Sequence, residues 1–176
     1  PALLGDVVAH CRMRLAGAFP RQIHAAVAAL DDAELWWRPH AGTNSVGHLV
    51  RHLAGNVRHI VGHLVGGSAY VRDREAEFAA PPVPRAALLA EFDAAIAEAD
   101  AVLAALPVAR LGEPSREPAH YATVLEDLLN VTIHMATHVG QIVWIAKLLR
   151  EGALDDVWRR AHREVGAYGR ALRRGP

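Results

Sequence analysis

Apolar residues recur every three or four positions through the first part of the chain, which is the spacing that gathers them on one face of a helix. This pattern predicts a helix from about residue 3 to about residue 30. Pro20 interrupts the run, and because proline has no N–H to donate and its ring crowds the preceding turn, we expect this helix to be kinked. Its apolar positions are Leu4, Val8, Cys11, Leu15, Ile23, Val27 and Leu30.

A second helix is predicted after residues 31–43, a structured connection that contains two tryptophans, a proline and a glycine. Either Asn44 or Ser45 can cap its first turn, because a short side-chain oxygen accepts from a backbone N–H that has no partner within the helix. The glycine pair at 66–67 ends this helix. Its apolar stripe consists of Val46, Leu49, Leu53, Val57, Ile60 and Leu64.

Two more helices are predicted in the second half of the chain. Residues 68–84 are polar and then proline-rich, which indicates a long crossover connection before the third helix. Pro84 can begin that helix, and its apolar repeat lasts until Pro107. The fourth helix is predicted from Thr123 to Arg150, a stretch without proline. The amphipathic tail over residues 153–173 favours a short fifth helix.

These elements predict an all-α fold, a four-helix bundle with a long crossover between helices two and three. We expect one domain over residues 1–176, with its core in residues 3–150, because a chain of this length buries enough apolar surface for a single core. Hydrophobic residues make up 52% of the chain and aromatic residues only 6%, a mixture that favours packed helices over sheets.

Charge and cysteine content exclude several classes of protein. The formal net charge is zero, so the chain lacks the positive field on which nucleic-acid binding depends. Cys11 is the only cysteine, which excludes an internal disulfide and fits a reducing compartment. Since no stretch of about 18 apolar residues is free of charge or histidine, we expect no membrane association and a cytoplasmic location.

Six of the eleven histidines lie on just two of the predicted helices, and their spacing indicates a metal site. His134 and His138 are one turn apart, so their imidazoles can converge on one ion, and a third imidazole from a neighbouring helix completes a tripod. The second helix offers four histidines on one strip. We choose His52 as the third ligand, because it lies at mid-helix beside a core leucine, and we keep His48 and His59 as residues that support the ligands.

Two alternative interpretations bear on this site. A lone histidine on a helix is usually a surface residue or a hydrogen-bonded core residue rather than a ligand. The pair at 134 and 138 is stronger evidence, since Val131 and Ile142 mark the same face as interior. The zinc-protease helix motif has a glutamate directly after its first histidine, and Met135 at that position argues against peptidase activity.

A ligand imidazole needs an acceptor for its second ring N–H, which fixes its tautomer and its direction. Four side chains lie one or two turns from the predicted ligands and are candidates for this role: Asn56, Asp127, Asn130 and Gln141. The alternative for Asp127 and Gln141 is that they are ordinary solvated helix residues. Arg72 and Arg74, in the crossover, can bind an anionic co-substrate or simply belong to a solvated loop.

Three segments resemble the DinB/YfiT-like superfamily of metal-binding four-helix bundles: the loop Trp36–Pro39, the segment Ser45–Asn56 and the run His134–Ile142. The resemblance extends over about residues 3 to 150. It implies a down-up-up-down bundle, often a homodimer, in which His52, His134 and His138 bind a divalent ion. It also implies a link to thiol-dependent enzymes, since some members of the superfamily use a low-molecular-weight thiol in S-transfer or isomerisation.

The sequence supports two functions of different classes. The first is a metal-dependent enzyme acting on a small-molecule substrate, a thiol S-transferase or a hydrolase, because three nitrogen ligands leave a coordination position open. Zn or Ni suits three imidazoles best, with Mn or Fe as alternatives. The second is a non-catalytic stress-related or structural protein whose dimeric helical bundle is itself the function. The sequence identifies no catalytic residue beyond the metal ligands.

Overall fold

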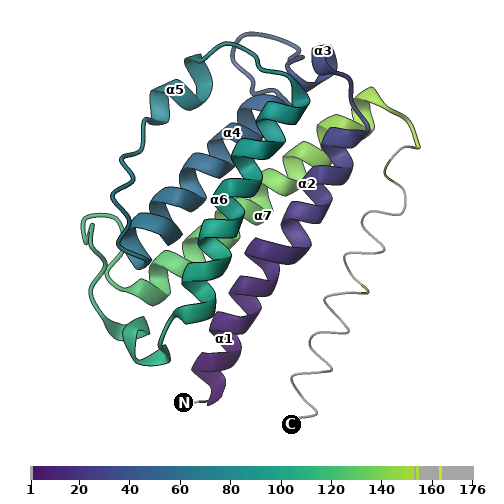
Figure 1. Cartoon of the computed structure of the whole chain (residues 1–176). Coiled ribbons are helices and arrows are strands. Elements are labelled where there is room, and N and C mark those ends of the chain that lie inside the picture. Colours follow the sequence, from purple (N-terminus) through teal and green to yellow (C-terminus); the bar gives the residue numbers. More distant parts are fainter. Residues whose placement is uncertain (1, 153, 155–162, 164–176) are drawn as a thin grey trace.

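The protein is an all-α bundle of four long helical segments, as the computed structural model of residues 2–152, 154 and 163 shows (Figure 1). The first segment runs up, the second and third run down, and the fourth runs up again, so the long crossover joins two parallel helices. This confirms the predicted fold class and the position of the crossover. The segments are α1–η1–α2 (Ala2–Arg12, Met13–Ala18, Phe19–Ala28), α4–η2 (Val46–Val57, Arg58–Val65), α6 (Arg85–Ala105) and α7 (Val124–Leu149).

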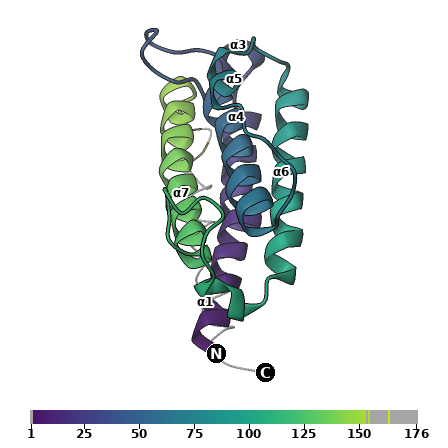
Figure 2. The same ribbon diagram turned by 90° about the vertical axis from the view of Figure 1, so that its left-hand side faces the viewer.

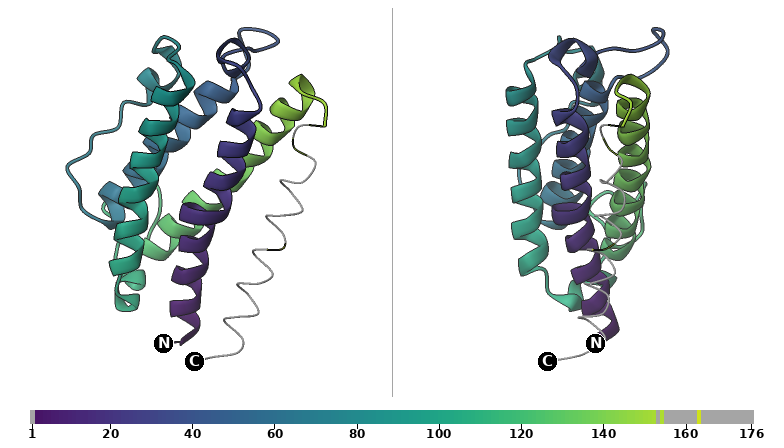
Figure 3. Two further views of the ribbon diagram at one scale, coloured as in Figure 1. Left: turned by 45° about the vertical axis from the view of Figure 1, so that its right-hand side comes forward. Right: turned by 90° about the vertical axis from the view of Figure 1, so that its right-hand side faces the viewer.

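The first segment is helical throughout, and a π-helical stretch, η1, lies just before Pro20, the residue at which a kink was predicted. Pro20 has no N–H for the bond to the preceding turn, and a wider turn just before it lets the chain continue without a clash. This segment packs between α6 and α7, as seen from its outer side in Figure 3. Of the predicted core positions here, Leu4 is exposed while the others are buried.

The connection to the second segment contains a single helical turn, α3 (Asp32–Leu35). Asp31 and Glu34 form a reciprocal capping box at its start. After it, the Trp36 indole donates to the Val83 carbonyl oxygen at 3.0 Å, which fastens this connection to the end of the crossover. The prediction of a structured connection is confirmed, although the short helix was not foreseen.

Ser45, one of the two predicted caps, begins α4. Its hydroxyl accepts from the His48 backbone N–H, and the His48 ring closes a capping box on the Ser45 backbone. The helix then widens into the π-helical stretch η2, which ends at Val65. After the cap residue Gly66, the chain turns at Gly67, whose φ of +80° is the left-handed conformation that glycine favours. Figure 2 shows α4–η2 between α6 and α7.

The crossover is not wholly irregular, because residues Arg74–Ala79 form a short helix, α5, that packs against α4. Asp73 caps its first turn by accepting from the Ala76 N–H at 2.9 Å. Short helix α5 lies beside α4 in Figures 1 and 2. Its position determines which crossover side chains reach the interior of the bundle.

The third and fourth segments start and end close to their predicted bounds. Pro84 and Leu106 are the capping residues of α6, and Thr123 and Arg150 are those of α7. Between them lies a 3-10 helix, η3 (Val108–Gly112). The apolar repeat predicted for α6 is buried, at Leu88, Phe92, Ile96, Ala99 and Leu103. The predicted fifth helix, over residues 153–173, falls largely outside the described residues. Within the part of the chain that the structure describes, no helix is long and apolar enough to cross a membrane.

Candidate metal centre

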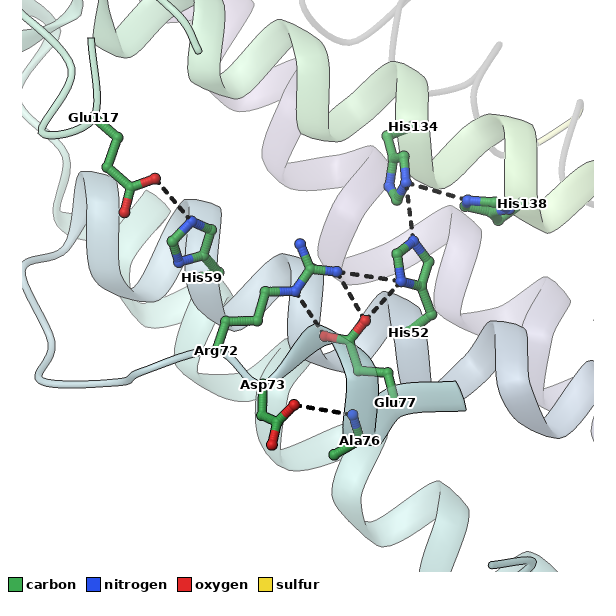
Figure 4. A network of polar contacts seen from close by, with 9 residues as sticks. All are labelled: His52, His59, Arg72, Asp73, Ala76, Glu77, Glu117, His134 and His138. Carbon is green, nitrogen blue, oxygen red and sulfur yellow. Dashed lines mark hydrogen bonds and ion pairs between the residues drawn. The ribbon is translucent and has the colours of Figure 1, made fainter. Parts of the chain in front are cut away.

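Three imidazoles converge inside the bundle, one from α4 and two from α7 (Figure 4). His52 Nε2 lies 3.1 Å from His134 Nε2, and His138 Nε2 lies 3.1 Å from the same atom. The ligand atoms of all three residues lie within 4.8 Å of one another. The structure therefore brings together the three histidines that the sequence analysis selected.

The spacing of these nitrogens fits a shared cation. Two nitrogens bound to a tetrahedral zinc ion at about 2.05 Å are about 3.3 Å apart, close to the two separations found here. Hydrogen bonding alone does not satisfy the cluster. A neutral imidazole carries one proton, so His134 can donate to only one of its two neighbours, and at least one lone pair is left facing another nitrogen. A divalent ion accepts all three lone pairs at once.

Glu77 orients His52. Its Oε2 accepts from His52 Nδ1 at 2.7 Å, which places the proton on Nδ1 and leaves Nε2 free to bind a cation (Figure 4). Arg72 holds the carboxylate on its other side, donating from Nε to Oε1 at 2.6 Å and from Nη2 to Oε2 at 2.9 Å. The Glu77 side chain is only 6% exposed, so a fixed pair of ionic contacts compensates the burial of its charge.

A glycine on α4 makes room for this carboxylate. A Cβ atom on Gly55 would overlap Oε1 of Glu77 and lie 2.9 Å from its Cδ. Short helix α5 can thus press Glu77 against α4 only because position 55 has no side chain. Gly55 is a packing requirement of the site rather than a flexible point in the helix.

Gln141 orients the second ligand. Its Oε1 accepts from His138 Nδ1 at 2.6 Å, so the proton of His138 also lies on Nδ1 and its Nε2 faces the other rings. This is the contact expected of a helix residue three positions after the ligand. The Nδ1 atom of His134 is buried and has no hydrogen-bond partner among the described residues.

The surroundings of His134 and His138 favour their neutral forms. Burial lowers the pKa of His134 to about 4, and the nearby His138, His52 and Arg72 act in the same direction. Burial also lowers the pKa of His138, and His52 adds to that effect, although the hydrogen bond with Gln141 opposes it. Neutral imidazole is the form that binds metals. At neutral pH, therefore, no proton has to be displaced from either group before an ion binds.

In contrast to His134 and His138, Glu77 is held in its charged form. Burial raises its pKa, but the hydrogen bonds from His52 and Arg72 and their charges outweigh that effect and hold the pKa below its ordinary value. The carboxylate is then charged throughout the neutral range. A charged acceptor strengthens the electron donation of the imidazole that it holds.

The three histidines line one end of a cavity of about 380 Å³ between α4–η2, α7 and the crossover. Arg72, Arg74 and Phe78 line it from the crossover side, and the loop before α7 lines its far end. A volume of this order is typical of small-molecule sites. A bound ion would thus face a space that a ligand can enter.

Other predicted supporting residues have different roles. His48 caps α4 through Ser45, at 2.7 Å between its Nδ1 and the hydroxyl, instead of supporting the ligands. Asn56 was expected to orient His52, but Glu77 holds that position and Asn56 Oδ1 has no partner in the described chain. Nor does Asn130 or Asp127 reach the orphaned Nδ1 of His134.

His59 and Asp127 lie deeper along the same seam of the bundle. His59 Nε2 is 3.3 Å from Glu117 Oε2, so it is paired away from the triad. Asp127 is fully buried, which contradicts a solvated position, and burial raises its pKa, an effect that the neighbouring Ser115 side chain opposes. Both residues belong to the surroundings of the cavity rather than to the ligand sphere.

Sequence reasoning missed Glu77. It lies in a charged run that resembles a solvated loop, and its partner His52 precedes it by 25 residues. The available signal was a weak one: Asp73 followed by acidic residues within one turn is the pattern of a helix start. Recognising α5 would have placed Glu77 on a defined element, with Arg72 just before its cap.

A comparison with protein-family models matches residues 8–158 to one family, described as "Protein of unknown function (DUF1572)". The matched range includes all three histidines of the cluster as well as Glu77. In a search of curated proteins, no sequence matches this chain.

Proposed function

The chain belongs to the DUF1572 family, and from this membership and the histidine cluster we propose that it is a divalent-metal-binding protein of the DinB-like superfamily that acts as a metal-dependent enzyme on a small molecule. The residues that resemble that superfamily are the ones that the fold brings together: His52 from the second segment and the pair of histidines on α7. A thiol S-transferase or a hydrolase is the reaction type that we propose.

One observation carries the proposal: three Nε2 atoms face one another, and acceptors fix the ring orientation of two of them. A structural zinc site usually has four protein ligands, whereas a catalytic one has three and an open position. The described chain supplies three, and they border a cavity. Three protein ligands and an open position are typical of a catalytic metal ion, which exchanges its remaining ligand during the reaction.

The contacts indicate which role the ion would have and which roles the chain's own residues have. A divalent ion held by neutral imidazoles supplies Lewis acidity at a position that water or a thiol can occupy. The chain's own residues hold and orient it: Glu77 and Gln141 keep the protons of His52 and His138 on Nδ1, away from the ion. Zn or Ni fits this nitrogen set best, and Mn or Fe is an alternative.

Elemental analysis of untagged protein tests the proposal. We expect close to one equivalent of a divalent first-row metal in the wild type and loss of that metal in His134→Ala. A matched control is His24→Ala, because His24 pairs with Asp93 on the bundle surface, far from the cluster in sequence and contacts. In cobalt-substituted protein, titration with low-molecular-weight thiols should change the visible spectrum. Wild-type protein that binds no metal after exposure to these ions would refute the proposal.

A second candidate function rests on the exposed face of α7. Four large apolar side chains there are exposed by 43% to 66%, an unusual density for one helix face in water: Leu129, Ile133, Trp144 and Leu148. Such a face suits a second copy of the chain, as in a dimeric, stress-related or structural bundle without catalysis. Sedimentation of an Ile133→Glu, Trp144→Glu variant would then show monomers where the wild type shows dimers.

The cellular phenotypes of two variants distinguish the two candidate functions. If the bundle alone is the function, the α7 face variant loses the phenotype while His138→Ala keeps it. If the metal centre is the function, His138→Ala abolishes the phenotype in a protein that still folds and still has the wild-type oligomeric state.

A further inference from the structure

The cavity has a second polar end, opposite the histidine cluster. His59 from η2 and Glu117, His120 and Tyr121 from the loop before α7 line it. The proposed metal chemistry uses none of these four residues. Figure 4 shows the His59–Glu117 pair set well apart from the three converging histidines.

Between the two ends of the cavity, pairs of polar residues follow one another at intervals of about one turn where α4–η2 packs against α7. These helices are antiparallel, so a step forward along one is a step back along the other. His52 faces His134, and one turn further along both helices Asn56 and Asn130 line the cavity. One more turn leads to His59 on one helix and to Asp127 on the other. Two helical turns correspond to about 10 Å, which is the distance that we take to separate the two ends.

The loop that carries Glu117 is held firmly in place. Arg110 donates to the Val65 carbonyl oxygen at 3.1 Å and Arg116 donates to that of Leu64 at 3.0 Å, which fastens the loop to the end of η2. Across the loop itself, the Ser115 N–H donates to the Ala122 carbonyl oxygen at 3.1 Å. Glu117 is therefore presented to the cavity by a braced loop rather than by a free one.

The charges of the cavity wall are divided between its ends. Arg72 is neutralised by Glu77, and the Arg74 guanidinium lies 5.5 Å from the centre of the Phe78 ring; both are on the crossover side. At the loop end, the acidic group that lines the cavity is Glu117, whose side chain is 40% exposed. The loop end is thus the one that attracts a positive group.

Asn56 gives independent evidence for a ligand. It lines the cavity between the two ends, is only 8% exposed, and its Oδ1 has no hydrogen-bond partner among the described residues. Buried carboxamide oxygens nearly always accept a hydrogen bond. A ligand with several N–H donors would supply the missing bond.

We propose that the loop end of the cavity is a recognition subsite for a primary ammonium group, held by Glu117 with His59 and Asn56 beside it. The substrate class that fits is a small amine that also carries a metal-binding atom about 10 Å from its nitrogen. The requirement for a metal-binding atom rests on the proposed function. Glu117 binds the substrate and takes no part in the reaction at the ion.

Binding of ω-amino alkanethiols to cobalt-substituted protein tests this subsite. The probes are cysteamine, which is too short to span the cavity, and 8-aminooctane-1-thiol, which is long enough, with 8-hydroxyoctane-1-thiol as the neutral match. In the wild type, we expect the long aminothiol to bind at least about tenfold more tightly than the hydroxythiol, and cysteamine to gain nothing from its ammonium group.

The variant Glu117→Gln should remove most of the preference for the amine while its cobalt content and its helical circular dichroism stay at wild-type values. Glu91→Gln is the matched control, because Glu91 is an exposed carboxylate on α6 that does not line the cavity. Equal affinity for the two long thiols in the wild type, or a preference that Glu117→Gln leaves intact, would overturn the subsite.

Failure of the metal proposal would be visible separately, as absence of cobalt binding in every variant. The subsite is then tested in chelator by calorimetric titration with octylamine and with octan-1-ol. A preference for the amine that depends on Glu117 supports the subsite without any metal, and equal binding of both compounds refutes it.

Discussion

Glu77 is the residue on which the geometry of His52 depends most. It accepts from Nδ1 at 2.7 Å and is itself held by two contacts from Arg72. Replacing it with glutamine keeps the size of the side chain but removes the charge. We expect Glu77→Gln to lower metal affinity by about 10- to 100-fold, the usual effect of losing an outer acceptor.

Competition with a chromogenic chelator measures this change. Glu75→Gln is the control, since Glu75 lies on the same short helix and is exposed. An unchanged affinity in Glu77→Gln would mean that His52 is oriented by packing alone, for instance against Phe78, whose ring centre is 5.1 Å away.

The depressed pKa of His134 makes stability depend on pH. In the unfolded chain this imidazole titrates near 6.5, whereas burial and its neighbours lower the pKa to about 4 in the folded protein. Between these values the unfolded state binds more protons, so the free energy of unfolding falls as the pH is lowered from about 6.5 toward about 4. Over this whole interval the free energy of unfolding falls by an amount of the order of 3 kcal/mol. Above the unfolded pKa, His134 adds no pH dependence to the stability.

Urea unfolding of metal-free protein at pH 7 and at pH 4.5 measures the effect. His134→Gln lacks the titrating group and should lose less stability over this interval than the wild type does. If both proteins lose the same amount, the acid sensitivity comes from other groups, and His134 is not held neutral by its surroundings.

At the residue scale, the clustering of the three histidines was predictable, whereas most of the residues that orient them were not. His134 and His138 are one turn apart on a face marked by apolar neighbours, so helical periodicity alone places them together. Gln141 follows from the same local geometry, because it lies on the same helix. Glu77 comes from another element, and the register between α5 and α4 is set by packing that the sequence pattern does not encode.

Among the elements, α4 shows how one helix can serve two purposes. Its apolar side faces the core, while Gly55 lets α5 approach closely enough for Glu77 to reach His52. In Gly55→Ala the new Cβ would overlap the carboxylate, so either Glu77 or the whole of α5 must move. We expect metal affinity to fall by an amount similar to that of Glu77→Gln, about 10- to 100-fold.

Gly140→Ala on α7 is the matched control. A Cβ at this position would meet nothing within 4 Å, so the change removes only the backbone freedom of a glycine within a helix. It should raise the free energy of unfolding by about 0.5–1 kcal/mol without weakening metal binding. Loss of metal in Gly140→Ala as well would show that Gly55 has no special place in the site.

The elements that the sequence did not predict have local physical causes. Both π-helical stretches continue directly from an α-helix, and a wider helix of six or eight residues changes the apolar spacing little. Short helix α5 has only a few residues, and its charged sequence resembles a loop. By contrast, α6 carries a long regular repeat between two prolines, and its bounds were predicted to within about two residues.

For the molecule as a whole, the order of the segments puts His52 and the pair His134 and His138 on neighbouring helices. The crossover joins two parallel segments, which leaves α7 to return antiparallel beside α4–η2. Ligands from two long helices are then fixed by the same contacts that build the core. The site is a local addition to a core that extends over all four segments, since large buried side chains occur on each of them.

This arrangement predicts how the protein responds to loss of its ion. A bundle with this much apolar core does not need a metal to fold, unlike a small zinc domain. We therefore expect chelator to leave the helical circular dichroism at 20 °C unchanged. The melting temperature should still fall, because an ion that binds only the folded state stabilises it by about 2.7 kcal/mol at a hundredfold excess over its dissociation constant. For a chain of this size, that corresponds to about 5–10 °C.

The triple variant His52→Ala, His134→Ala, His138→Ala provides the comparison for this experiment. It removes the ligands, so its melting temperature should not respond to chelator or to added zinc. A wild type whose melting temperature is likewise unaffected would show that the cluster holds no ion. A wild type that unfolds in chelator at 20 °C would show instead that the ion is part of the core, because the packing of the four segments would then be insufficient without it.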